Sequence, residues 1–138
     1  MRDPIPGRGA PPRILILDDD RFMLAVLRDM VTELCDASVR TEADARRALR
    51  ALRDPAPDLL ICDLSMPDMD GIEFMQAAAQ AGYRGAIVLL SGMDSGVRMA
   101  AEHLARAQGL NVVDTFEKPL GAQQFLEVLA QLQARKGA

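Results

Sequence analysis

The chain has 138 residues, 49% of them hydrophobic and 26% charged, which is an ordinary composition for one globular domain with a core of its own. Its formal net charge of -4 argues against a basic nucleic-acid-binding surface and against a polybasic membrane-binding surface. The sequence also contains no apolar stretch of membrane-spanning length and no signal-peptide core.

The two cysteines and the one histidine carry no metal-binding pattern. Cys35 and Cys62 fall in a predicted helix end and a predicted buried strand, so we interpret them as core residues rather than a disulfide, which fits a reducing cytoplasm. His103 lies within a predicted helix, away from every predicted strand end. We interpret it as a surface residue, and the spacing argues against a structural zinc site.

Residues 1–12 contain four prolines and two glycines and are predicted to form a disordered leader, followed by a single domain over residues 13–138. Five short segments of this domain predict strands, and most of these segments are apolar throughout. Such runs indicate strands that are buried on both faces, as a parallel sheet requires. The predicted strands cover residues 13–17, 37–40, 57–63, 86–90 and 110–115.

Helical periodicity follows each predicted strand, with apolar residues at steps of three or four. The predicted helices cover residues 22–34, 45–52, 72–81, 95–108 and 122–134. Thr41 is predicted to cap the second helix with its hydroxyl, with Asp44 three residues later. Gly82 is predicted to end the third helix, and Gly109 is predicted to cap the fourth in a left-handed conformation. Strict alternation of strand and helix predicts a doubly wound α/β domain with a parallel sheet and helices on both faces.

Reactive side chains follow the predicted strands at the point where each strand ends. In a parallel sheet these carboxyl ends lie at one edge, where open α/β sheets hold their sites. The side chains are Asp18 and Asp19 after the first strand, Asp63 at the end of the third, Ser91 after the fourth and Lys118 beyond the fifth. Crowded carboxylates repel one another, and a hard divalent cation with oxygen ligands offsets that repulsion. We therefore predict a Mg²⁺ site.

This set of groups suits attack by an aspartate on phosphorus to give an acyl phosphate. Phosphoryl transfer needs in-line positioning and charge stabilisation, which Mg²⁺ and Lys118 would supply. Asp63 would be the nucleophile, and it needs no general base because a carboxylate is ionised at neutral pH. Ser91 would donate a hydrogen bond to the transferred phosphoryl group.

These segments resemble the response-regulator receiver domains of two-component signalling, and the resemblance covers roughly residues 13–135. It rests on ILILDDD at 14–20, DLLICDLSMPDMDG at 58–71, IVLLSG at 87–92 and EKP at 117–119. It implies a flavodoxin-like sheet of five parallel strands in the order 2-1-3-4-5.

By this resemblance Asp63 is the phosphoacceptor, Ser91 is the switch hydroxyl and Lys118 pairs with the phosphate. Mg²⁺ would be bound by carboxylates and one backbone carbonyl, namely those of Asp18, Asp19, Asp63 and Ser65. The peptide bond that precedes Pro119 is often cis in the family. The phosphodonor would be a sensor histidine kinase or a phosphotransfer protein, and the domain would catalyse only its own phosphorylation and dephosphorylation.

One position departs from the family pattern. The family usually has an aromatic ring three residues before the lysine, where this chain has Thr115, and the ring stands at Phe116. Adjacent strand residues point to opposite faces, so Phe116 is not a simple replacement. We expect the phosphorylation chemistry to survive this change, whereas it puts the usual route from phosphorylation to output in question.

The leading hypothesis is a stand-alone cytoplasmic receiver that switches a protein-binding surface, since nothing after Lys118 encodes a further domain. By resemblance this surface would comprise the helix at 95–108, the strand at 110–115 and the helix at 122–134, without direct contact to nucleic acid or membrane, and homodimerisation stays open. One alternative is a receiver-like interaction or dimerisation module that is not phosphorylated. Another is a haloacid-dehalogenase-like phosphatase. Residues 18–20 match the Asp-x-Asp motif of that class only trivially, because all three are aspartates.

Overall fold

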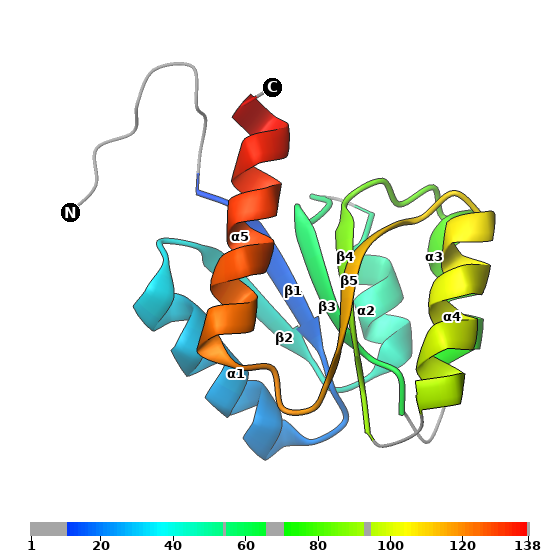
Figure 1. Cartoon of the computed structure of the whole chain (residues 1–138), viewed down its shortest axis with the longest axis horizontal. Helices are drawn as coiled ribbons and strands as arrows, with labels where there is room; N and C mark the ends of the chain where they lie inside the picture. The colour runs from blue at the N-terminus through cyan, green and yellow to red at the C-terminus, as the bar shows by residue number, and fades with distance from the viewer. Residues whose placement is uncertain (1–10, 54, 66–70, 93–94, 138) are drawn as a thin grey trace.

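A computed structural model describes residues 11–53, 55–65, 71–92 and 95–137. Strands and helices alternate along the chain (Figure 1). The strands are β1 (Arg13–Leu17), β2 (Ser38–Glu42), β3 (Leu59–Asp63), β4 (Ala86–Ser91) and β5 (Asn111–Glu117). The helices are α1 (Arg21–Leu34), α2 (Ala45–Ala51), α3 (Gly71–Gln80), α4 (Ser95–Ala107) and α5 (Ala122–Gly137). All neighbouring strands pair in parallel in the order β2-β1-β3-β4-β5, which confirms the predicted fold.

Two apolar layers enclose the sheet, because successive side chains of a strand point to opposite faces. On β1, Ile14 and Ile16 pack with α1 and α5, whereas Leu15 and Leu17 pack with the layer that contains α2, α3 and α4. Figure 1 shows these two groups of helices on opposite sides of the sheet. Strands β3 and β4 are buried along their whole length, which explains why their sequences show no polar alternation.

Helix α2 begins differently from the prediction. Thr41 is not its cap, because β2 continues to Glu42 and pairs Thr41 with Ile16 of β1. Asp44 is the N-cap instead, and its Oδ1 accepts a hydrogen bond of 2.8 Å from the amide of Arg46. Thr41, which local capping rules had favoured, is therefore part of a paired strand, and Asp44 caps the helix in its place.

Two predicted glycine ends are confirmed. Gly82 and Gly109 have φ angles of 79° and 88°, in the left-handed region where a side chain is disfavoured. The predicted leader lies mostly outside the described residues, which begin at residue 11. Its last residue is fixed at the sheet, since the carbonyl of Pro12 accepts a 2.9 Å hydrogen bond from the amide of Ser38.

Candidate functional site

Asp63 is the last residue of β3 and is fully buried, with 0% of its surface exposed. It is held in place at both carboxylate oxygens. Its Oδ1 accepts a 2.9 Å hydrogen bond from the amide of Ser65, and its Oδ2 lies 2.8 Å from Nζ of Lys118. A buried carboxylate is costly without such partners, so this acid is positioned for a purpose other than packing.

Asp18 follows β1 directly and is also buried, with 1% of its surface exposed. Its Oδ1 accepts a 2.9 Å hydrogen bond from the amide of Asp20, and its Oδ2 lies 3.4 Å from Nζ of Lys118. Burial raises the pKa of the Asp18 carboxyl to about 6, with a further increase from the nearby charge of Asp63, although the Asp20 amide and Lys118 act in the opposite direction.

Lys118 connects the two buried acids. It follows β5 directly, and its amide donates a 2.8 Å hydrogen bond to the carbonyl of Ser91 at the end of β4. Burial alone would lower the pKa of Lys118, but the hydrogen bond and charge of Asp63, together with Asp18, outweigh it and raise the pKa. The Lys118–Pro119 peptide bond is cis, as the resemblance implied.

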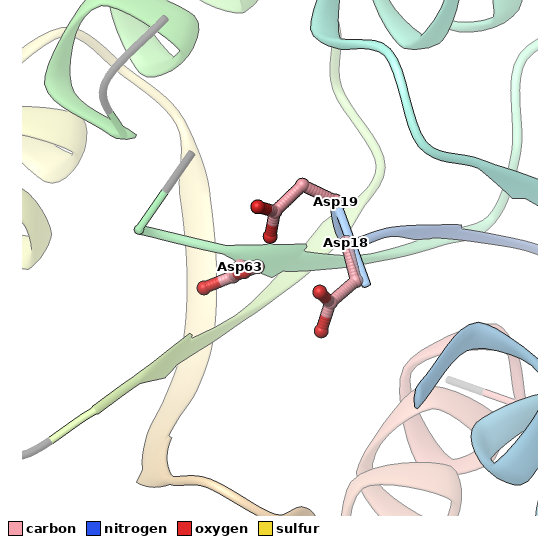
Figure 2. A group of neighbouring side chains, drawn as sticks. All are labelled: Asp18, Asp19 and Asp63. Atoms are coloured by element: carbon pink, nitrogen blue, oxygen red, sulfur yellow. The ribbon is translucent and has the colours of Figure 1, made fainter. Parts of the chain in front are cut away.

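Three carboxylates form a group that could hold a metal ion. Asp18, Asp19 and Asp63 each offer one oxygen, and these oxygens lie within 4.8 Å of one another. Figure 2 shows the three side chains gathered where β1 and β3 end. With all three acids ionised and Lys118 protonated the local charge is -2, so a divalent cation would neutralise it. Oxygen-only donors of this kind fit Mg²⁺ better than zinc.

Ser91 ends β4, one residue beyond Leu90, the partner of Asp63 in the sheet. Its hydroxyl is buried and finds no hydrogen-bond partner among the described residues. A buried hydroxyl without a partner costs free energy, so this group is available to an oxygen of a bound ligand. Ser65 is exposed and contributes its amide to Asp63; metal binding by its carbonyl stays a prediction.

The structure brings together the residues that the sequence predicted at one edge, but sequence reasoning missed the close approach of Gly71 to Leu64. The amide of Gly71 donates a 3.2 Å hydrogen bond to the carbonyl of Leu64. A Cβ atom on Gly71 would lie 2.9 Å from Cα of Leu64, closer than packed atoms allow. The sequence had indicated a loop and then a helix that begins at Asp70 or Gly71, and it gave no sign of this contact, although glycine is the residue that permits such a close approach.

Thr115 and Phe116 lie on opposite faces of β5, as the alternation predicted. Thr115 pairs with Leu89, whose side chain packs in the layer of α2, α3 and α4. Phe116 pairs with Leu90 and packs against the core under α1 and α5. Phe116 therefore does not take the place of a ring at position 115.

Residues outside this site agree with the simpler interpretations of the sequence. Cys35 and Cys62 are buried thiols that do not form a disulfide with each other, and His103 is exposed on α4. None of the helices in the described part of the chain has the length and apolar character needed to cross a membrane.

Comparison with known proteins gives a consistent picture. Residues 14–130 match the family model described as the response regulator receiver domain. The chain is 28% identical to the cyclic di-GMP phosphodiesterase RocR of Pseudomonas aeruginosa over 89% of this chain and 32% of that protein. It is also 28% identical to the chemotaxis protein CheY of Bacillus subtilis, over 85% of this chain and 93% of that protein.

Among solved structures, a response regulator from Colwellia psychrerythraea is similar with a TM-score of 0.76 and 36% identity, over 91% of this chain and 99% of that one. The chain spans only about a third of the length of several curated relatives that it matches, among them RocR and protein-glutamate methylesterases.

Proposed function

The chain belongs to the family of response regulator receiver domains of two-component signalling, and from this membership we propose that Asp63 accepts a phosphoryl group in a magnesium-dependent reaction. The observation that carries the proposal is the ion pair of 2.8 Å between the buried Asp63 carboxylate and Lys118, beside the buried Asp18. A nucleophilic acid, a fixed cation and two further acids are the groups that an aspartyl phosphate requires.

In the proposed reaction a carboxylate oxygen of Asp63 forms a bond to phosphorus, and the bond between phosphorus and the donor's histidine nitrogen breaks. The oxygen that bonds to phosphorus loses its negative charge, so Lys118 would then pair with the phosphoryl oxygens. The hydroxyl of Ser91, which has no partner in the part of the chain that the structure describes, would donate to one of these oxygens.

The carboxylates of Asp18, Asp19 and Asp63 and the carbonyl of Ser65 would hold Mg²⁺. When bound, Mg²⁺ would offset the negative charge of the phosphoryl group beside these acids. The fit rests on the oxygens of the three carboxylates, which lie within 4.8 Å of one another.

The phosphodonor would be a sensor histidine kinase or a phosphotransfer protein. Phosphorylation would shift the population of two arrangements of the surface formed by α4, β5 and α5, and this surface would bind a downstream protein. Because Thr115 stands where the family usually has a ring, this output would not depend on the movement of an aromatic side chain at that position.

The test is the intact mass of the protein after incubation with acetyl phosphate, with and without Mg²⁺. The wild type should gain one phosphoryl group only with Mg²⁺, and Asp63→Asn should gain none. Asp36→Asn is the matched control, because Asp36 is an exposed acid between α1 and β2 and should leave the gain intact.

Absence of any mass gain in a folded wild-type protein would contradict the proposal and would favour a receiver-like interaction module that is not phosphorylated. Labelling of Asp63→Asn at the wild-type level would show that another residue is the acceptor. Sustained hydrolysis of a phosphate ester, with many turnovers per protein, would instead favour a phosphatase.

A further inference from the structure

Helix α2 presents a surface on which every exposed residue is an arginine. Between residues 45 and 53 the other side chains are buried or half-buried, and the buried ones include Ala45, Ala48 and Leu52. The exposed residues, which we call the arginine face, are Arg46, Arg47, Arg50 and Arg53. With 3.6 residues per turn, Arg46, Arg47 and Arg50 lie on the side of α2 opposite to its buried alanines, and Arg53 follows in the turn after the helix ends at Ala51.

The positive charges of the arginine face repel one another. Arg50 lies four residues from Arg46 and three from Arg47, which are the spacings at which helix side chains meet, and Arg53 adds a fourth positive charge in the turn after the helix. Like charges at these spacings destabilise a helix, whereas solvated helix surfaces commonly mix both signs. Nothing in the packing of α2 requires this repulsion, since the core contacts come from alanine and leucine.

No carboxylate among the described residues forms an ion pair with the arginine face. Elsewhere on the surface, Arg40 pairs with Glu42 at 2.9 Å and Arg106 pairs with Glu102 at 3.0 Å. The chain has 16 basic and 20 acidic residues, so without these four arginines the remainder has 12 against 20, a net charge of -8. The arginine face is therefore a concentrated positive patch on a strongly acidic protein.

We propose that the arginine face binds an acidic segment of a partner protein that presents carboxylates one helical turn apart. Guanidinium groups form two-point hydrogen bonds with carboxylates, and a row of them at helical spacing complements such a segment. This inference does not depend on phosphorylation of Asp63, because α2 contributes no residue to the carboxylate and lysine cluster.

A protein segment fits the surrounding charge better than other anions do. A nucleic acid is a long polyanion and would extend beyond four arginines onto a remainder of charge -8, which repels it. An anionic membrane would favour a helix with exposed apolar side chains beside its charges. The exposed large apolar residues of the described chain are Phe22, Val26, Met99 and Leu126, and none of them lies on α2.

The experiment is an NMR titration of the ¹⁵N-labelled full chain with a synthetic helical peptide that carries glutamate at every fourth position. A peptide of the same length with glutamine in place of glutamate serves as the control ligand. The glutamate peptide should shift amide signals mainly within residues 45–53, and the glutamine peptide should not shift them.

Two charge-matched variants decide whether the contact is specific. The combined variant Arg46→Gln, Arg50→Gln and Arg53→Gln should bind the glutamate peptide about tenfold more weakly, as expected for the loss of three exposed ion pairs. The control replaces exposed arginines elsewhere, with Arg21→Gln, Arg28→Gln and Arg84→Gln, and should bind within about twofold of the wild type. Amide dispersion checks that both variants stay folded.

Three results would overturn the proposal. Equal weakening in both variants would mean that the peptide senses net charge alone. Amide shifts centred away from residues 45–53 would move the contact to another surface. Displacement of the peptide by a single-stranded oligonucleotide or by phosphatidylserine vesicles at lower concentration would identify a nucleic acid or a membrane as the preferred anion.

Discussion

Replacing Lys118 with methionine tests the central electrostatic argument for the site. The Nζ atom of Lys118 lies 2.8 Å from Asp63 and 3.4 Å from Asp18, and the two acids are 0% and 1% exposed as side chains. Lys118→Met keeps the aliphatic stem but leaves both buried carboxylates without their cation. The variant should therefore be strongly destabilised in a buffer with EDTA.

The magnitude follows from the burial of the partners. Removal of one member of a fully buried ion pair costs about 3 to 5 kcal/mol, because the remaining charge is uncompensated. The Lys118 side chain is 26% exposed, so water partly screens the ion pairs that it forms. We therefore expect a loss of about 2 to 3 kcal/mol in the free energy of unfolding. The pKa of Lys118 is raised in the folded state, so its contribution is fully present below its unfolded pKa and is lost only as pH rises through the folded value.

The assay is urea unfolding near neutral pH of the wild type, Lys118→Met, Asp63→Asn and the double variant. If the loss comes from uncompensated charge, Lys118→Met should cost about 1 kcal/mol less in the Asp63→Asn background, because one buried charge is then absent. Added Mg²⁺ should stabilise Lys118→Met at least as much as it stabilises the wild type. A cost below about 0.5 kcal/mol, or an equal cost in both backgrounds, would refute the reasoning.

Three further predictions follow from the site and its supporting loop. The pKa of Asp18 is raised from 3.8 to about 6, so the folded protein binds a proton that the unfolded chain releases, and its stability relative to Asp18→Asn should fall by about 2 kcal/mol as pH rises from about 4 to about 7 without metal. If urea unfolding shows the same difference in free energy of unfolding between the wild type and Asp18→Asn across that pH range, the prediction is wrong. Gly71→Ala should cost about 1 to 3 kcal/mol in the free energy of unfolding because its Cβ meets the backbone of Leu64. Gly92→Ala is the control and should change little, because its Cβ meets no atom of the described residues within 4 Å. Equal unfolding midpoints for the two glycine variants would argue against the close approach. Ser91→Ala should not lower the free energy of unfolding, since its buried hydroxyl has no partner among the described residues, but it should slow phosphorylation by acetyl phosphate. An unchanged rate in the mass assay would exclude Ser91 from phosphoryl binding.

The sequence was sufficient for the architecture because the strands carry a strong local signal. The fully apolar runs of β1, β3 and β4 indicate burial on both faces without knowledge of any partner. Once the sheet is parallel, the reactive residues must meet at its carboxyl edge. Asp18, Asp63 and Lys118 could therefore be grouped before any distance was known.

Details that depend on partner strands could not be predicted from local pattern. The extension of β2 through Thr41 depends on the length of β1, and so does the transfer of the cap to Asp44. The shift in register between β4 and β5 near Ile87 and Val88 has no local sequence signal, and β5 itself runs to Glu117, two residues beyond its predicted end at Thr115. Such features result from tertiary pairing, which overrides local propensity.

The position of Lys118 in the sequence also determines when, during translation, the two buried acids can pair with their cation. Asp18 and Asp63 leave the ribosome well before their shared cation, which follows β5. A nascent chain without Lys118 that closed the sheet around both acids would bury two uncompensated charges, which is costly. We therefore expect ribosome-stalled chains to become protease-resistant only after Lys118 has emerged; resistance of chains stalled before that point would refute this.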